Sequence, residues 1–212
     1  MRRTPMTEED HRRVSEAIRI AESRTSGEIY CVLAHRSDSY FFPAAVSVLA
    51  SILLISVGAA LVLDQMWLSV SLAWFASAQV LSAGCGLLVL WLFAPLRIFL
   101  VPHSLRQSRA HDNAWKQFLS RNVHRTARRT GVLIFLSLEE RYAEVVADSG
   151  INAKVVSGTW QAVVDILIDG ARSGRPAEGF VEAVEAVGEL LAEHFPVGAG
   201  DENELDDHLV EI

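Results

Sequence analysis

Two adjacent carboxylates, Glu139 and Glu140, are the residues of this sequence best suited to bind a hard cation. They lie in a short polar segment between two apolar runs, and carboxylate oxygens are the ligands that calcium prefers. Four further polar residues are expected at the same edge of a sheet: His35, Ser37, Asp38 and Arg141. A solvated hairpin turn without a ligand is the alternative, and it is the interpretation we favour for this segment.

Two other acidic residues, Glu28 and Asp148, are predicted at the opposite edge of the sheet. A strand of about six residues separates the two edges by roughly 20 Å, so one metal ion cannot bridge both groups. Asp148 precedes Ser149 and Gly150, a pattern typical of a turn or of a helix-capping aspartate. Glu28 begins an apolar run and is expected to pair with an arginine of the segment 125–129.

The motifs of common enzymes do not occur in the sequence. None of the seven histidines belongs to an HExxH or similarly spaced zinc motif. The Ser-Gly pairs lack the context of a nucleophile elbow, and no glycine-rich loop could cradle a phosphate. We therefore predict no set of catalytic residues, and common hydrolases and nucleotide-dependent enzymes are disfavoured.

Hydrophobic periodicity predicts the elements that would position these residues. Thr7 caps a helix whose third residue is Asp10, and the apolar run Glu28–Ala34 predicts a buried strand. The later elements are predicted in this order: a helix over 105–129 with Trp115, Phe118 and Leu119 on its apolar face, a hairpin of strands over 131–147, and helices that begin near Trp160 and Pro176. The first strand can bury both faces only by pairing with strands about a hundred residues later, so residues 1–41 and 103–195 should form one α/β domain.

Two long uncharged segments, residues 43–63 and 68–93, interrupt this domain. At about 1.5 Å per residue the shorter one forms a helix of roughly 32 Å, enough to cross a hydrocarbon core of about 30 Å. Only residues 64–67 separate them, so we predict a transmembrane hairpin. Because neither span contains a charge, the hairpin is expected to be an anchor rather than an ion or proton pathway. A buried hairpin of a soluble protein is the alternative, but this chain has little mass left to cover two such helices.

Basic residues predict the orientation of the hairpin. The connection at 64–67 contains no Lys or Arg, whereas arginines flank the hairpin on both sides. By the positive-inside rule, both termini and the α/β domain face the cytoplasm from the inner membrane. Three arginines after the second span are expected to contact lipid headgroups: Arg97, Arg106 and Arg109. They lack interleaved aromatic residues, so no nucleic-acid partner is expected.

The second span also carries a stripe of small residues, Ala78, Ser82 and Gly86. Such a stripe lets helices approach closely, and it predicts either packing within the hairpin or a homo-oligomer formed through the second span. Cys85 lies in the same apolar segment, and it and Cys31 are expected to act as small hydrophobic residues rather than to form a disulfide.

Charge is distributed unevenly along the chain. Residues 1–131 carry 15 Lys and Arg against 9 Asp and Glu, whereas residues 132–212 carry 4 against 17. Six of these carboxylates, and no basic residue, fall within residues 197–212. This composition predicts an acidic, disordered tail.

Several segments of the sequence carry a resemblance to a known family. They are Thr25-Ser26-Gly27-Glu28-Ile29, Arg129-Thr130-Gly131-Val132-Leu133-Ile134, Glu139-Glu140-Arg141, Ala147-Asp148-Ser149-Gly150-Ile151 and Trp160. In their order along the chain they resemble the TPM domain family, and above all a bacterial branch of membrane proteins in which two spans interrupt the domain. The resemblance covers nearly all of the chain outside the spans and implies a three-layer α/β/α, Rossmann-like fold. For some relatives it also implies calcium binding and acid phosphatase activity.

Two segments depart from the pattern of that family where its chemistry would matter. Many relatives have Asn-Asn-Gly where this chain has Arg129-Thr130-Gly131, and Asp-Asp-Arg where it has Glu139-Glu140-Arg141. The first change removes an oxygen ligand and adds a positive charge, which weakens the expectation of a calcium site.

The sequence therefore predicts a membrane-anchored, non-catalytic interaction or assembly module. Its expected partners are the lipid bilayer and an unidentified membrane or cytoplasmic protein. The alternative is a calcium-dependent, acid-phosphatase-like hydrolase of phosphate esters with Glu139 and Glu140 as metal ligands. A small transporter or channel is disfavoured, because the two spans carry no charge.

Overall fold

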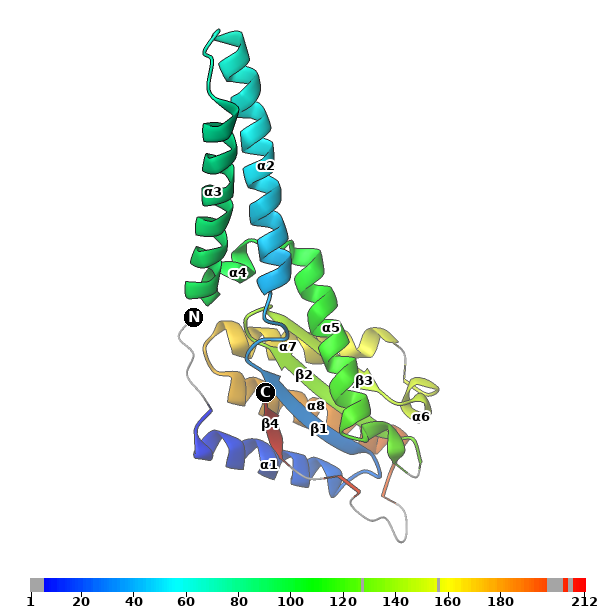
Figure 1. The fold of residues 1–212 in the computed structure, drawn as a ribbon. Helices are drawn as coiled ribbons and strands as arrows, with labels where there is room; N and C mark the ends of the chain where they lie inside the picture. The colour runs from blue at the N-terminus through cyan, green and yellow to red at the C-terminus, as the bar shows by residue number, and fades with distance from the viewer. Residues whose placement is uncertain (1–5, 127, 156, 198–203, 206–207) are drawn as a thin grey trace. The chain divides into compact units, whose positions relative to one another are not determined.

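The structure, a computed structural model, describes residues 6–126, 128–155, 157–197, 204–205 and 208–212 (Figure 1). Internal contacts divide the chain into two compact units, one formed by Met1–Ser37 with Gln107–Ile212 and the other by Asp38–Arg106. The sequence predicts these boundaries near residues 41 and 103.

The first unit is built on a mixed, mostly parallel sheet. Its strands are β1 (Glu28–Ala34), β2 (Gly131–Ser137), β3 (Tyr142–Ala147) and β4 (Leu209–Glu211), in the order β3-β2-β1-β4. β1 runs parallel to β2 and to β4, whereas β2 and β3 form an antiparallel hairpin. Glu28 is opposite Gly131 in the register, so the predicted pairing of the first strand with a much later one is confirmed.

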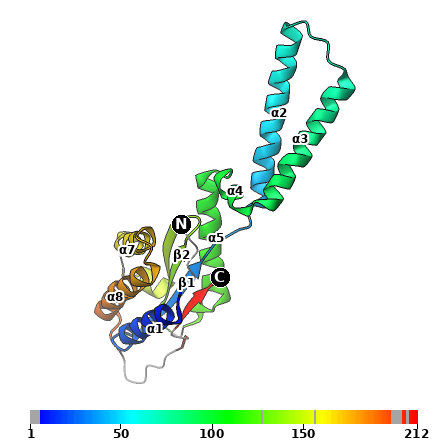
Figure 2. The same cartoon turned by 90° about the vertical axis from the view of Figure 1, so that its left-hand side faces the viewer.

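Helices cover both faces of this sheet (Figure 2). On one face lie α1 (Glu8–Glu22), α7 (Trp160–Arg172) and α8 (Pro176–His194), with the short helix α6 (Ser149–Asn152) and the 3-10 turn η2 (Ser157–Thr159) leading into α7. Alternate residues of β1 face this layer, and Ile29 and Leu33 are buried against Ile18 of α1 in the larger hydrophobic core. The mixed α/β class predicted from the alternation of helix and strand is therefore present.

The opposite face of the sheet is covered by α5 (His103–Ser120), which is shorter than predicted. The helix was expected to continue to residue 129, but it ends at Ser120 and is followed by the 3-10 turn η1 (Val123–Arg125). Asn122 has φ 60°, a left-handed conformation that an α-helix cannot continue through.

The buried face of α5 also differs from the expected one. Ala114 and Phe118 pack against the sheet, four residues apart, whereas Trp115 and Leu119 are 42% and 53% exposed. The buried face of α5 thus combines the small residue Ala114 with Phe118, and Trp115 and Leu119 lie on its outer side.

The second unit contains two helices that are long and apolar enough to cross a membrane, α2 (Phe41–Gln65) and α3 (Leu72–Leu92). The predicted spans were residues 43–63 and 68–93, and the connection at 66–71 is longer than the expected 64–67. Gly86 permits close packing of the pair, because a Cβ there would lie 2.8 Å from Val48 Cγ1. Gly86 belongs to the predicted stripe of small residues, and it makes its close contact within the hairpin.

A short helix, α4 (Ala94–Phe99), follows α3 within this unit. A small buried cluster unites Tyr40, Ala44, Leu90 and Val101 at the end of the hairpin where α2 begins and α3 ends. This cluster fixes the ends of the two helices, whereas most of their apolar surface is exposed.

The structure also corrects the expectation for the acidic tail. Residues 209–211 form β4, the edge strand beside β1, where a disordered segment was predicted over 197–212. Leu209 is only 3% exposed and belongs to the larger core. Apolar side chains on both faces of β4, Leu209 in the larger core and Val210 against the second one, thus place a strand in a segment whose composition is unfavourable for it. Residues 198–203 and 206–207 lie outside the described residues.

Gly131, at the start of β2, provides a test of this packing. A Cβ added there would lie 2.1 Å from the backbone O of Val123, so an Ala side chain would force β2 and η1 apart. We expect Gly131→Ala to lower the free energy of unfolding by about 1–3 kcal/mol in denaturant titrations of the detergent-solubilised protein. Gly158→Ala is the control, because no atom lies within 4 Å of the added Cβ. Equal stability of the two variants would contradict this description.

Candidate functional site

Polar side chains follow β1 and β2 at the edge where both strands end. Ser137 closes β2, Ser37 lies three residues beyond β1, and Glu140 lies in the turn between β2 and β3. Glu140 accepts a hydrogen bond from Ser37 N–H at 3.0 Å through Oε1 and one from the Ser137 hydroxyl through Oε2. Asn113 of α5 donates to Ser37 Oγ at 3.4 Å. The group forms a connected polar network, and Glu140 is 2% exposed.

This geometry gives the predicted cation ligands different roles. Glu140 points into the protein and uses both oxygens for internal hydrogen bonds, whereas Glu139 is half-buried and its backbone N–H donates to His35 O at 3.2 Å. Arg141 is exposed and has φ 54°. No group of three His, Cys, Asp or Glu side chains suited to a metal ion occurs in the part of the chain that the structure describes.

His35 and Ser37 do lie at the edge shared with Glu139 and Glu140, as predicted from parallel β1 and β2. Asp38 belongs to the other compact unit, where its Oδ1 accepts from Tyr40 N–H at 3.4 Å and from Ser39 Oγ at 3.3 Å. The polar edge of the α/β unit is therefore smaller than the sequence suggested, because the chain leaves the sheet at residue 37.

The opposite edge holds Glu28 and Asp148, both 7% exposed. Glu28 accepts from the backbone N–H groups of Glu204 and Leu205, each at 3.3 Å, and its pairing with an arginine of the segment 125–129 stays a prediction. At the same edge, Arg129 Nη1 lies 3.9 Å from Asp148 Oδ1. Glu28 thus connects the start of β1 to the C-terminal segment.

Asp148 caps α6, which confirms the capping interpretation. Its Oδ1 accepts from Ser149 N–H at 2.6 Å, and the cap residue has extended backbone dihedrals. The other oxygen, Oδ2, is buried without a hydrogen-bond partner among the described residues. A buried unpaired carboxylate oxygen is unfavourable unless something compensates it.

The segments that carry the family resemblance before β1, before β2 and after β3 meet at this second edge. They converge because β3 is antiparallel, so its end lies beside the starts of β1 and β2. Thr130 Oγ1 donates to Ser26 O at 2.9 Å, and Gly150 N–H donates to Arg129 O at 3.1 Å. The residues therefore tie three chain segments together mainly through backbone groups.

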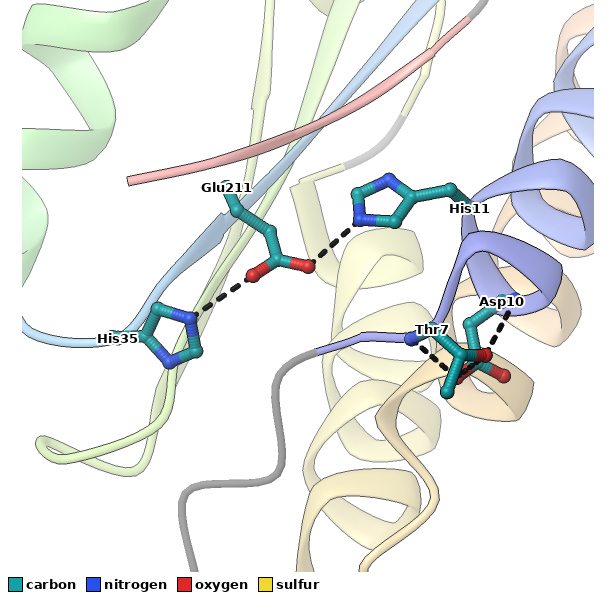
Figure 3. Close-up of polar contacts among 5 residues, drawn as sticks. All are labelled: Thr7, Asp10, His11, His35 and Glu211. Atoms are coloured by element: carbon teal, nitrogen blue, oxygen red, sulfur yellow. Dashed lines mark hydrogen bonds and ion pairs between the residues drawn. The ribbon is translucent and has the colours of Figure 1, made fainter.

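A third polar group was not found by sequence analysis and is drawn in Figure 3. Glu211 of β4 lies between two imidazoles: its Oε1 is 2.8 Å from His11 Nε2, and its Oε2 is 3.0 Å from His35 Nε2. One histidine comes from α1 and the other follows β1. Each imidazole contacts a different oxygen of the carboxylate. Glu211 therefore bridges the two histidine rings.

The first turn of α1 holds His11 in place (Figure 3). Thr7 Oγ1 accepts from Asp10 N–H at 3.1 Å, and Asp10 Oδ2 accepts from Thr7 N–H at 3.0 Å, which confirms the predicted capping box. These hydrogen bonds lower the pKa of Asp10. A lowered carboxyl pKa means that the box stabilises the helix at neutral pH and that this contribution is lost as the pH falls through that pKa.

A further set of interacting side chains lies between α5 and β3. His111 Nδ1 is 2.9 Å from Glu144 Oε2, and the Tyr142 hydroxyl donates to the same oxygen at 2.9 Å. Burial, and then the Glu144 carboxylate, raises the pKa of Tyr142. His111 also lines a shallow hollow together with Trp115 and Leu119. A carboxylate-oriented imidazole can act with a neighbouring nucleophile, but Ser120, a hydroxyl of this lining, donates to Gln117 O at 3.4 Å.

The arginines predicted to contact lipid have distinct surroundings. Arg97 donates to Leu90 O at 2.8 Å and to Trp91 O at 3.1 Å, and its guanidinium lies 5.3 Å from the centre of the Phe41 ring. It therefore caps the C-terminus of α3. Arg106 is half-buried and Arg109 is exposed.

The two cysteines are not joined by a disulfide. Cys31 is buried in β1 and Cys85 is exposed on α3. Burial raises the pKa of the Cys31 thiol, which keeps it protonated and supports its role as a small core residue.

The network around Glu140 predicts unequal effects of two adjacent substitutions. Glu140→Ala leaves the Ser37 N–H and the Ser137 hydroxyl without their acceptor, and we expect it to lower the free energy of unfolding by about 1–3 kcal/mol. The matched variant Glu139→Ala should have a clearly smaller effect in the same denaturant titration, because that side chain is half-buried. A larger loss in Glu139→Ala would reverse the roles assigned here.

Comparisons with known proteins give information on the fold alone. No family model matches the chain, and no curated protein matches it. Among solved structures, the chain is similar to the NMR structure of the BA42 protein from the psychrophilic bacterium Bizionia argentinensis. The TM-score is 0.61 at 19% sequence identity, and the match covers 100% of this chain and 98% of that one. The similarity shows that the two chains share a fold.

Proposed function

We propose that this protein is a membrane-anchored module that works by binding other proteins rather than by catalysis. The observation that carries the proposal is that carboxylates near the strand ends bind groups of the protein itself. Glu28, Glu140 and Glu211 each accept hydrogen bonds or ion pairs through both oxygens, and their partners belong to the protein itself. Carboxylates held in this way position strands and turns, and they are poorly placed to act as nucleophiles or general bases.

We further propose that the α/β unit is a TPM-type domain with a three-layer, Rossmann-like arrangement. In support, the resembling segments around Thr130 and Asp148 meet at one edge of a mostly parallel sheet, which gives them a common structural task. Helices lie on both faces of that sheet. The similarity to BA42 supports a recurrent fold for this unit and carries no activity with it.

The two apolar helices would anchor the module in the bilayer. α2 and α3 contain no charged residue other than Asp64, near the end of α2, and most of their apolar side chains are exposed. Such surface is stable in hydrocarbon and unfavourable in water. The distribution of arginines supports an inner-membrane hairpin with both termini in the cytoplasm, where a membrane or cytoplasmic protein could be bound.

A calcium-dependent, acid-phosphatase-like hydrolase is the second candidate. One observation favours it: the buried Oδ2 of Asp148, which has no hydrogen-bond partner among the described residues, is an oxygen of the kind that calcium takes. The originally predicted ligands fit less well, since Glu140 faces the Ser37 and Ser137 network.

Calcium titration and turnover of a generic phosphate ester separate the two candidates. For the detergent-purified full chain, we expect calorimetry to show no saturable calcium binding. Two variants are compared with the wild-type chain: Asp148→Asn, and the double variant Glu139→Ala with Glu140→Ala. The wild-type chain should hydrolyse the ester no faster than either variant. Calcium-dependent turnover that is lost in either variant would establish the hydrolase and refute the non-catalytic proposal.

Membrane extraction and reporter fusions test the anchor. The full chain should stay in the membrane pellet after an alkaline carbonate wash. Leu53→Arg with Leu81→Arg should shift it to the supernatant, because each arginine near a span centre costs about 2.5–3.5 kcal/mol. Leu53→Ala with Leu81→Ala is the matched control.

A reporter fusion tests the predicted orientation of the hairpin in the membrane. A reporter fused after Ile212 should be active only if it functions in the cytoplasm. Activity of a reporter that requires export would reverse the proposed topology, and release of the unmodified chain by carbonate would refute the anchor.

A further inference from the structure

Described residues of the C-terminal segment contact β1 near both of its ends. Residues 209–211 pair with Cys31, Val32 and Leu33 in a parallel register. The ladder continues beyond β4, where Ile212 N–H donates to Leu33 O at 3.0 Å and His35 N–H donates to Ile212 O at 2.8 Å. At the other end of β1, Glu28 accepts the N–H groups of Glu204 and Leu205. Residues 204–205 and 209–212 thus occupy the two ends of the free edge of β1.

Side chains add selectivity to these backbone contacts. Leu209 is buried in the larger core, and the ring of His208 lies edge-on to Tyr30 with 6.1 Å between ring centres. Two residues after Leu209, on the same side of the strand, Glu211 is held between His11 and His35 (Figure 3). The edge therefore selects an apolar residue and, two positions later, a carboxylate.

This combination is the one by which sheet edges bind extended peptides. Main-chain hydrogen bonds supply affinity for any extended segment, and pockets for alternate side chains supply specificity. An uncovered β1 would present a row of unpaired N–H and C=O groups, which favours the addition of another strand.

We propose that the edge of β1 is a strand-acceptor site, and that in an assembly it takes residues 204–212 of a second copy of this chain. This inference deepens the proposed binding function by naming the surface and the partner. The chain's own segment occupies the site in the structure, so a segment of the required chemistry is present in every copy. Such an exchange of an identical element between protomers is domain swapping.

The connection of β4 to the rest of the chain permits the exchange. Residues 195–208 separate α8 from β4 and would span about 45 Å when fully extended. No tight hairpin joins β4 to β1, because the two strands are parallel and lie at opposite ends of the sequence. Copies held in one membrane would also meet at a high effective concentration.

Peptide binding to the full chain tests the acceptor site. Leu209→Asp should expel the chain's own segment, and a fluorescent peptide of residues 204–212 should then bind saturably. The same peptide carrying Glu211→Gln should bind about tenfold more weakly, because it loses the charge held by two imidazoles. The wild-type chain is the matched control, and it should bind the peptide at least about tenfold more weakly because its site is filled.

A double-mutant comparison assigns the selectivity to the histidines. In a Leu209→Asp chain that also carries His11→Ala and His35→Ala, the peptides with and without Glu211→Gln should bind alike. If the folded Leu209→Asp chain, with an unchanged far-ultraviolet circular dichroism spectrum, binds no peptide, the acceptor site is refuted.

Cysteine exchange in otherwise intact chains tests the second copy as occupant and does not depend on the folding of Leu209→Asp. Both chains carry Cys31→Ala and Cys85→Ala. One tagged chain carries Val32→Cys and a co-expressed chain with another tag carries Val210→Cys, a pair in register between β1 and β4. A covalent heterodimer is expected. Replacing Val32→Cys by Val145→Cys on β3, at the far side of the sheet, is the matched control and should give none.

The outcomes separate this inference from the function on which it rests. Absence of the heterodimer, or an equal yield from the control pair, refutes exchange between copies. That result leaves the membrane anchor and the lack of turnover to be judged by carbonate extraction and by the phosphate-ester assay. Calcium-dependent turnover would refute the non-catalytic proposal even where the heterodimer forms.

Discussion

β1 is the element on which the α/β unit depends, because every residue of this strand is buried and both of its edges are paired by distant segments. β2 begins at Gly131 and β4 at Leu209, so neither edge is closed by a neighbour in sequence. The residues between β1 and β2 include the whole apolar hairpin. Such long-range pairing costs loop-closure entropy before any contact forms. Burial of apolar side chains compensates this cost, because β1 contributes residues to both hydrophobic cores.

The cost of burying polar groups explains why the buried acidic residues at the two edges of the sheet have partners within the protein. A buried carboxylate is unfavourable unless it is paired, and Glu28 and Glu140 have internal partners at opposite edges of the sheet. These residues share the composition expected of a catalytic or metal site, yet their hydrogen bonds fix chain crossings. Residue type alone does not distinguish these roles, because the distinction lies in where each oxygen points.

The sequence predicted the elements that have strong local signals. Glu28–Ala34 and Gly131–Ser137 are apolar runs bounded by glycine or polar residues, and both were placed correctly. The end of α5 was missed because the apolar periodicity was followed past Asn122, a residue type that readily adopts the left-handed conformation at a helix end. β4 was missed because three residues in an acidic segment carry no periodic signal. The Glu211 bridge could not be predicted, as it joins residues 200 and 176 positions apart.

The bridge also explains how so short a strand has a defined register. Side chains of a strand alternate between the two faces of a sheet, so a slip of β4 by one residue would move Leu209 out of the larger core. The same slip would turn Glu211 away from His11 of α1 and leave the carboxylate on the face covered by α5. Both penalties act together, because Leu209 and Glu211 share one face. The short ladder between β1 and β4 therefore has one favoured register, whereas its backbone hydrogen bonds alone would accept several.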